Sequence, residues 1–244
     1  MGIYVGNKRY APYIGDKRRR YMGGKKILPA NSYIQDGLIF QLDGFEKGSV
    51  NNAWVDLVGG YVFEFVSGMS SKNNCVEFTS NRTEIFSTDG TIQCMRNSAT
   101  IEVVHKNNGG ITQAFTFTGG VSGSLAFGCE YNSSGQLTRV VQSTTWYPSN
   151  TRAPSQTILA SDVNTISITD TTSMFNGVIG GNGSGWVNSP ITEQKIIVGS
   201  NTTGSRLFVG ELYAVRVYNR NLSTDEMLFN QQVDNSRFNL GLTI

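Results

Sequence analysis

The sequence predicts an all-β fold in which two antiparallel sheets pack against each other as a sandwich. Aromatic residues make up 11% of the 244 residues, glycine occurs 28 times and charged residues reach only 16%. This composition is typical of strands joined by glycine-rich and asparagine-rich turns, whereas long helices would need more Glu, Lys, Ala and Leu. About a dozen short runs also alternate between apolar and polar residues, as half-buried strands do.

The predicted strands follow one another closely and favour one large sandwich over two small domains. They span residues 37–44, 61–66, 75–78, 83–86, 99–104, 112–117, 124–127, 136–141, 165–168, 173–175, 195–198, 207–209 and 212–218. Asn176 and Gly177 come directly after one of these runs. This dipeptide favours a type I′ turn, which predicts a tight hairpin at that point.

One helix is predicted near the C-terminus. Ser223 and Glu226 have the spacing of a capping box, in which each side chain bonds to the backbone of the other residue. Met227, Leu228 and Val233 then supply an apolar face. The helix is expected to be short and to continue to about residue 234.

The first 31 residues form a basic arm that is distinct from the body at 32–244. Residues 1–28 contain eight Lys and Arg against one acid, a net charge of +7, and the rest contains 12 bases against 17 acids, a net charge of −5. A unit of aromatic, apolar, glycine, turn-forming and lysine residues occurs three times, at 4–8, 13–17 and 21–25. Each unit is expected to form part of a strand and a hairpin turn.

The arm is predicted to dock the body onto a partner, because such short strands cannot bury a core by themselves. Homotrimerisation is one way to complete these strands, and nucleic acid is the disfavoured alternative partner. The repeat resembles short segments of structural and tail-associated bacteriophage proteins. The candidate docking residues are Tyr4, Lys8, Tyr13, Lys17, Arg18, Arg19, Arg20, Tyr21 and Lys25.

Three segments of the body resemble the concanavalin A-like lectin/glucanase superfamily, in its laminin-G-like branch. They are the opening strand at 37–44 with the Trp54 segment that follows, the strand and hairpin at 166–177, and the run at 208–226. The last contains a Tyr-Asn-Arg-Asn-Leu corner before the capped helix and is the most specific. The resemblance implies a jelly roll of two curved antiparallel sheets, with Trp54 buried.

The sequence contains no recognisable catalytic machinery, so the chain is not expected to be an enzyme. Glycosidases of this superfamily place their carboxylates in a Glu-x-Asp-x-x-Glu arrangement, which is absent here. Glu64, Glu77, Glu84 and Glu102 are expected to lie singly on separate strands and to face solvent. His105, the only histidine, is expected at the end of a strand.

No cofactor is expected, although calcium is the candidate metal because many relatives hold it through carboxylate and carbonyl oxygens. By position, Asp43 and Asp56 are the candidate ligands. Cys75, Cys94 and Cys129 have no metal-like spacing and are expected to be buried thiols on strands.

Glycan binding is predicted to depend on exposed aromatic rings with polar neighbours. Trp146 and Tyr147 lie in a polar, proline-containing segment, and Trp186 lies between Gly185 and Val187. These three residues are the candidate glycan contacts, with burial or an oligomer contact as the competing interpretation.

Together these features predict a non-catalytic structural protein of a bacteriophage virion, such as a head fibre or capsid-decorating subunit. It would fold in the bacterial host cytoplasm, since no secretion signal or membrane span is recognisable. The arm would bind a capsid or tail protein, and the sandwich would bind glycans of the host cell surface. The alternatives are a stand-alone bacterial carbohydrate-binding module and a glycosidase with an atypical site.

Overall fold

The described part of the chain forms a β-sandwich with one helix. In the computed structural model, the described residues are 28–48, 50–108 (the side chain of 96 excepted), 163–180, 188, 190–191, 194–200 and 207–244, with the backbone alone of β1–β4 and β12–β14. The strands are β1 (Ile3–Val5), β2 (Lys8–Tyr10), β3 (Tyr21–Met22), β4 (Lys25–Lys26), β5 (Leu38–Asp43), β6 (Ala53–Val55), β7 (Val62–Glu64), β8 (Met69–Ser71), β9 (Val76–Phe78), β10 (Ser87–Asp89), β11 (Thr100–Asn107), β12 (Ala114–Thr116), β13 (Phe127–Tyr131), β14 (Leu137–Val141), β15 (Val163–Ile168), β16 (Ser173–Phe175), β17 (Val178–Ile179), β18 (Lys195–Ile197) and β19 (Gly210–Tyr218). The helices are the single turns η1 (Ala30–Ser32) and η2 (Arg96–Ser98) and the helix α1 (Thr224–Phe238).

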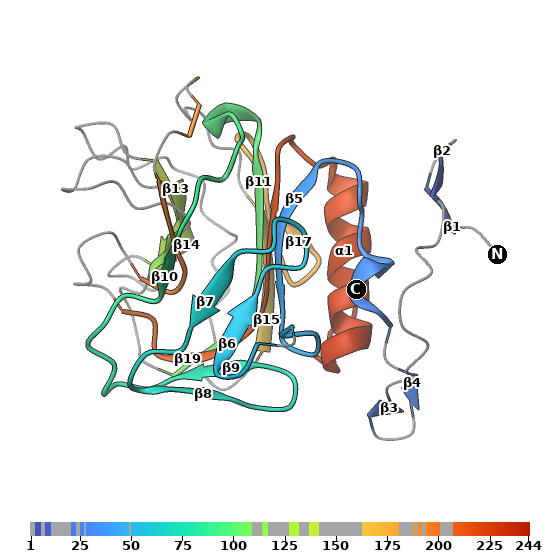
Figure 1. Ribbon diagram of the computed structural model, residues 1–244. Coiled ribbons are helices and arrows are strands. Elements are labelled where there is room, and N and C mark those ends of the chain that lie inside the picture. The colour runs from blue at the N-terminus through green and yellow to red at the C-terminus, as the bar shows by residue number, and fades with distance from the viewer. Residues whose placement is uncertain are drawn as a thin grey trace.

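An eight-stranded antiparallel sheet forms one layer of the sandwich. Its order is β17-β16-β15-β11-β19-β9-β8, and β5 also pairs with β19. The two-stranded ribbons β6–β7 and β10–β18 lie against one face of this sheet, and α1 lies on the other side (Figure 1). The all-β sandwich with one C-terminal helix is therefore confirmed.

The main core lies between the large sheet and the two ribbons. Trp54 and Phe63 pair across the β6–β7 ribbon and are both 0% exposed, so the expected burial of Trp54 is confirmed. Residues of β11 and β19 alternate in direction: Val103 and Val215 belong to this core, whereas Glu102 and Arg216 project toward α1. The period of two thus gives the large sheet two buried faces.

Helix α1 has the predicted N-terminal cap and continues beyond the predicted end. The Ser223 side chain accepts from the backbone N–H of Glu226, whose carboxylate in turn accepts from the N–H of Ser223. Asn239 closes the helix in the left-handed conformation, with φ of 54°. No helix of the described residues is long and apolar enough to cross a membrane.

Replacing Ser223 by Ala is expected to lower the free energy of unfolding by about 1 kcal/mol, because it removes the acceptor for the Glu226 N–H. Urea denaturation followed by circular dichroism measures the change. Ser236→Ala, at an exposed position of the same helix, is the matched control and should change stability by less than half as much. Equal effects of the two substitutions would contradict the capping role.

Most strand predictions agree with the structure, with two exceptions. The predicted strand at 83–86 is wrong, since the nearest strand is β10 at 87–89. The predicted strand at 207–209 is not formed. Of the predicted strand at 124–127, residues 124–126 lie outside the described residues, and β13 begins at Phe127. The Asn176–Gly177 hairpin is confirmed, with φ of 48° and 81° at these two residues.

Two of the three arm units contain the predicted hairpins. Val5 pairs with Lys8 between β1 and β2, and Met22 pairs with Lys25 between β3 and β4. Two residues therefore join each pair of strands. The middle unit, 13–17, lies outside the described residues.

Candidate functional site

A row of buried polar side chains crosses the large sheet beneath α1. Ser167 on β15 lies opposite Glu102 on β11. Arg216 on β19 lies between Glu102 and Gln41 of β5. Antiparallel register alone thus brings these four side chains onto one face of the sheet.

Arg216 is the centre of this network. Its Nε donates to Glu102 Oε2 at 2.7 Å, and its two terminal nitrogens donate to the two oxygens of Asp234 on α1 at 2.9 and 2.8 Å. All three side chains are 0% exposed. A two-pronged pair of this kind fixes the geometry as well as compensating the charge.

Helix α1 supplies uncharged polar groups to the same network. Asn230 Nδ2 donates to Glu102 Oε2 at 2.9 Å and to the Tyr218 hydroxyl at 3.0 Å. Gln231 Nε2 donates to Ser167 Oγ at 3.1 Å. Because each of these contacts needs a particular helix residue, the network fixes the rotation and position of α1 on the sheet.

The segment 28–36, here called the arm root, completes the network. The Tyr33 hydroxyl donates to Asp234 Oδ1 at 2.8 Å, and the Arg216 guanidinium lies 3.8 Å from the centre of the Tyr33 ring. The backbone N–H of Ile34 donates to Asn230 Oδ1 at 3.0 Å. The arm root is thus held by both the sheet and the helix.

The contacts of the arm root begin ahead of the predicted boundary at residue 32. The Leu28 carbonyl accepts from Arg237, and the Ala30 N–H donates to Glu46 Oε1 at 2.9 Å. The Ala30 carbonyl accepts from Gln41 Nε2 at 3.1 Å. Residues 28–31 therefore contact the body directly.

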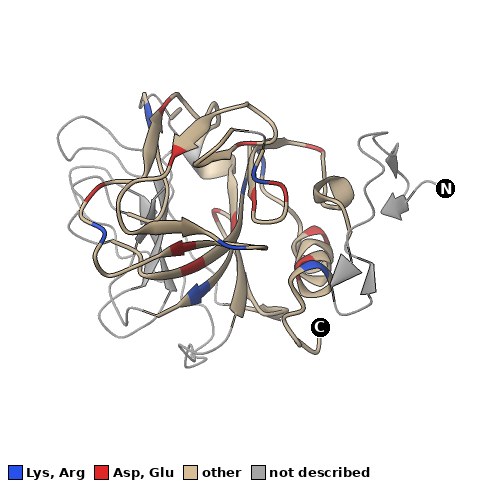
Figure 2. Ribbon diagram, turned by 60° about the horizontal axis from the view of Figure 1, so that its bottom comes forward, with Lys and Arg blue, Asp and Glu red and all other residues tan. Residues whose placement is uncertain are grey.

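The expectation that Glu102 faces solvent is wrong. Burial raises the pKa of the Glu102 carboxyl, and the Arg216 guanidinium opposes that shift. Burial and the Asp234 carboxylate likewise raise the pKa of Tyr33. Figure 2 shows acidic and basic residues together along α1. Since none of the groups in the network is exposed, the network positions structural elements and offers no surface to a substrate.

A sequence signal for this network exists on the helix. Asn230, Asp234 and Arg237 are spaced four and three residues apart, which places them on one face of α1. A polar stripe at helical spacing opposite a strand that contains a charged residue could have indicated a buried interface. The apolar pattern around Glu102 gave no such indication, because it fits a solvated face equally well.

The two candidate calcium ligands, Asp43 and Asp56, accept hydrogen bonds from protein donors. Asp43 Oδ2 accepts from Arg237 at 2.6 Å, with both side chains buried. Asp56 Oδ1 accepts from the N–H of Gln41 at 2.7 Å, and its Oδ2 accepts from Gly59 at 2.7 Å. Burial raises the pKa of Asp56. Among the described residues, no group of three His, Cys, Asp or Glu side chains is placed to hold a metal.

Two cysteines are buried as expected, but neither lies on a strand. Cys75 precedes β9 and Cys94 lies between β10 and η2. Burial raises the pKa of the Cys75 thiol to about 11. Cys129 lies on β13, of which only the backbone is described.

His105 lies inside β11 rather than at the end of the strand. It is 0% exposed, and burial lowers its pKa to about 3 because the imidazolium would lose its hydration. The neutral form is thus the one present in the folded protein near pH 7.

Acidification is expected to destabilise the protein through His105. Below about pH 6.5 the unfolded chain binds a proton at this residue, while the folded chain does so only near pH 3. The free energy of unfolding should therefore fall by about 2 kcal/mol between pH 7 and pH 5 through this group. Urea denaturation of the wild type and of His105→Leu at both pH values tests this, since the variant should lose less over the same interval. An identical loss in both proteins would contradict the assignment.

The other candidate residues lie outside the described side chains. Trp146, Tyr147 and Trp186 fall in the gaps at 142–162 and 181–187. Of the docking residues, Tyr4, Lys8, Tyr21 and Lys25 lie on the described backbone of β1–β4. The other docking residues lie outside the described residues: Tyr13, Lys17, Arg18, Arg19 and Arg20.

Comparisons with solved structures show which fold this is. A sialidase of Trypanosoma rangeli aligns with a TM-score of 0.55 at 14% identity, over 82% of this chain and 33% of the sialidase. Domain 4 of the arabinanase AbnA from Geobacillus stearothermophilus, in complex with arabinotriose, aligns with a TM-score of 0.60 at 14% identity, over 78% of this chain and 96% of that domain. The fold is that of a lectin-like β-sandwich. No family description and no curated protein sequence matches the chain.

A third structure extends the likeness to a smaller module. The carbohydrate-binding module CBM40 of a Ruminococcus gnavus sialidase, bound to α2,3-sialyllactose, aligns with a TM-score of 0.50 at 16% identity, over 65% of this chain and 96% of that module. The chain spans about a third of the length of the sialidases, whereas it matches the two single modules over nearly their whole length.

Proposed function

We propose that this chain is a non-catalytic carbohydrate-binding module that is anchored to a larger assembly through its N-terminal arm. The observation that carries the proposal is the alignment of the sandwich with two carbohydrate-bound modules over 96% of their lengths. The sialidase alignment covers only 33% of that enzyme, so it supports a shared module and not a shared activity.

The buried charge network favours binding over catalysis. Glu102 and Asp234 are the two carboxylates that share Arg216. Both are 0% exposed, at the interface between the sheet and α1. A glycosidase needs two carboxylates on either side of a substrate, and this buried pair is not accessible to one.

The anchoring role is assigned to the arm. Its net charge of +7 contrasts with −5 on the rest of the chain, and its hairpins are too short to be stable alone. In this proposal the larger assembly is a virion, to whose capsid or tail protein the arm binds, and the sandwich faces the host surface. A stand-alone bacterial carbohydrate-binding module is the alternative, in which the arm has no such partner.

The first experiment applies the full chain to an array of bacterial glycans, with arabinotriose and α2,3-sialyllactose as soluble probes. Specific binding without release of new reducing ends is the expected result. Repeating the array with a chelator tests whether calcium takes part. Cleavage of a bound glycan would favour the glycosidase, and no binding to any glycan would contradict the proposal.

The anchor is tested separately by removing residues 1–27 and leaving the arm root in place. The truncated chain is expected to keep its glycan binding and to lose its association with particles in a sedimentation assay with phage capsids. Retained association would contradict the anchoring role of the arm and leave the glycan proposal intact.

A further inference from the structure

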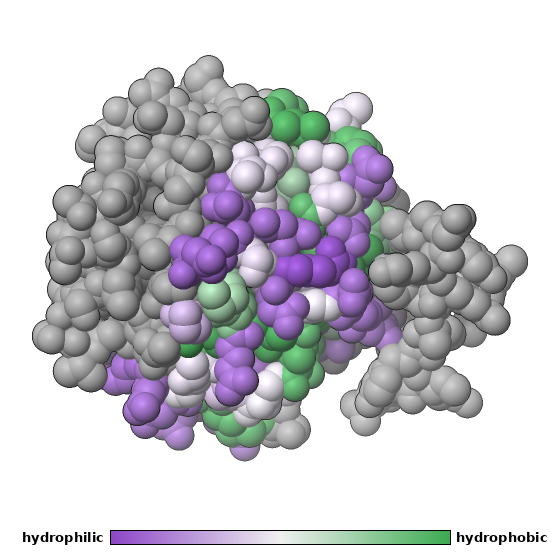
Figure 3. Space-filling view, turned by 90° about the horizontal axis from the view of Figure 1, so that it is seen from above, coloured by the Kyte–Doolittle hydropathy of each residue, from purple (hydrophilic) through white to green (hydrophobic). Residues whose placement is uncertain are grey.

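The turn between β16 and β17 places an asparagine directly before a glycine, at Asn176 and Gly177. Other asparagines, such as Asn81 and Asn219, are exposed, and Figure 3 shows hydrophilic residues spread over the described face seen from above. Asn176 is only partly exposed, and the positive φ of 48° and 81° at the two turn residues fits a type I′ turn. The dipeptide therefore has a defined conformation.

An asparagine followed by a glycine is prone to lose ammonia without an enzyme. The backbone nitrogen of the glycine attacks Cγ of the asparagine side chain, so that a bond between N and Cγ forms and the bond between Cγ and Nδ2 breaks. The proton of the backbone nitrogen passes through water to the departing amide nitrogen, which leaves as ammonia. Water then opens the succinimide ring at either carbonyl and gives aspartate or isoaspartate. Glycine favours the attack because it has no side chain that hinders the approach.

The side chain of Asn176 is held against β15. Its Oδ1 accepts from the N–H of Thr165 at 2.9 Å, and its Nδ2 donates to Asn164 Oδ1 at 3.0 Å. The backbone N–H of Asn176 donates in turn to the Thr165 carbonyl at 3.0 Å. Rotation of Cγ toward the nitrogen of Gly177 would therefore break both side-chain hydrogen bonds.

Helix α1 holds the attacking nitrogen through Gln231, a residue that is 0% exposed. The N–H of Gly177 donates to Gln231 Oε1 at 2.7 Å. Gln231 Nε2 donates to the Met174 carbonyl at 3.2 Å and to Ser167 Oγ at 3.1 Å. Since the carbonyl can only accept and the N–H can only donate, the Gln231 amide has one orientation. Both reacting groups are thus held in place as long as α1 lies on the sheet.

We propose that Asn176 is a latent site of spontaneous deamidation, which α1 keeps unreactive and which reacts when the helix moves off the sheet. The products oppose the return of the helix. An aspartate at position 176 has no amide to donate to Asn164. An isoaspartate lengthens the backbone inside the turn, so the N–H of Gly177 no longer meets Gln231. Deamidation thus leaves a permanent record of each opening of α1.

The arm root controls the same helix and should therefore control the reaction. The N–H of Ile34 donates to Asn230, the neighbour of Gln231, and the Tyr33 hydroxyl donates to Asp234. A chain that begins at Gly37 lacks both contacts. It is expected to deamidate at position 176 faster than a chain that begins at Leu28.

The test follows deamidation of the full chain at mildly alkaline pH by peptide mapping and mass spectrometry. In urea, Asn176 should react as fast as the asparagines of the other two Asn–Gly pairs of the sequence, at 108–109 and 182–183. In the folded chain it should react roughly tenfold or more slowly than in urea, because only molecules in which α1 has opened can react. Equal rates of Asn176 in the folded chain and in urea would overturn the proposal, and this comparison needs no variant.

Two variants of α1 test the role of Gln231. Gln231→Leu should raise the folded-state rate at Asn176 about fivefold, the factor that corresponds to the loss of one hydrogen bond. Gln232→Leu, at an exposed position of the same helix, is the matched control and should leave the rate unchanged. Equal rates in the two variants would contradict the role of Gln231.

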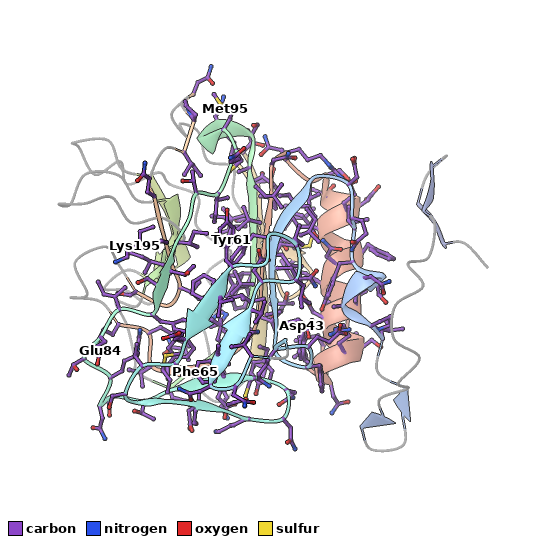
Figure 4. The ribbon with its side chains drawn as sticks, viewed as in Figure 1. Asp43, Tyr61, Phe65, Glu84, Met95 and Lys195 are labelled. Atoms are coloured by element: carbon purple, nitrogen blue, oxygen red, sulfur yellow. The ribbon has the colours of Figure 1, made fainter. Side chains whose placement is uncertain are left out.

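A variant of the main core separates the role of Gln231 from a general loss of stability. Phe63→Leu alters a buried residue of β7, and its neighbour Phe65 lies on the side of the large sheet away from α1, whereas Asp43 lies beside the helix (Figure 4). Urea denaturation measures the stability of both variants. Phe63→Leu is expected to change the rate at Asn176 less than Gln231→Leu does. A rate increase in Phe63→Leu that matches its loss of stability as closely as in Gln231→Leu would show that global unfolding alone controls the reaction, and would overturn the proposal.

Discussion

Replacing Arg216 by Met is expected to lower the free energy of unfolding by about 3–5 kcal/mol, because it leaves two buried carboxylates without a counter-charge. Met fills a similar volume, so the loss reports on charge more than on packing. Urea denaturation at pH 7.5 measures it. The variant should regain stability as the pH falls, since Glu102, whose pKa is already raised by burial, can then be protonated in the folded state.

Two further variants test whether the loss comes from charge. The first is a triple variant that combines Arg216→Met with Glu102→Gln and Asp234→Asn. It removes both negative charges together with the positive one and is expected to restore much of the stability. Lys72→Met removes an ion pair at the surface with Glu77 and Glu211 and should cost less than about 1 kcal/mol. A loss in Arg216→Met no larger than that in Lys72→Met would contradict the importance of the buried pair.

Removal of the arm root is expected to destabilise the sandwich far more than removal of the arm that precedes it. The comparison is between a chain that begins at Leu28 and one that begins at Gly37. The shorter chain loses Tyr33 and Ile34, which are 3% and 2% exposed, and leaves Asp234 and Asn230 without two of their partners. The expected difference in the free energy of unfolding is about 4 kcal/mol or more, from the burial of two large side chains and the unpaired polar groups. Chemical denaturation of the two truncated chains measures this difference directly.

A point substitution serves as the control for the truncation. Tyr33→Phe keeps the ring against Arg216 and removes only the hydroxyl that donates to Asp234, so it should cost about 1–2 kcal/mol. Equal stability of the chains that begin at Leu28 and Gly37 would show that the arm root is a linker and not part of the folded body.

Much of the fold could be predicted from local patterns. Alternation in the segments that became β5, β11, β15 and β19 indicated half-buried strands, the Asn176–Gly177 pair indicated a hairpin, and Ser223 with Glu226 indicated the start of α1. These features depend on neighbouring residues only, because turn geometry and helix capping are local. The segment at 83–86 was wrong because Phe86 is buried in the main core without belonging to a strand.

The polar network beneath α1 was harder to predict, since it combines residues that are distant in the sequence. Tyr33 and Arg216 both donate to Asp234, and the Ile34 N–H donates to Asn230. No spacing in the sequence brings these segments together. The aromatic residues that the sequence did indicate, Trp146, Tyr147 and Trp186, lie outside the described residues, so their role stays a prediction.

The sequence by itself determined which residues share a face of each strand, because side chains alternate with a period of two. Glu102 and Arg216 were thus bound to point away from the main core, opposite to Val103 and Val215. Only the tertiary structure decided what covers that outer face. α1 and the arm root pack over it and exclude water, which turns two outward charges into a buried ion pair. Periodicity gives the direction of a side chain, whereas its environment depends on which distant segment packs there.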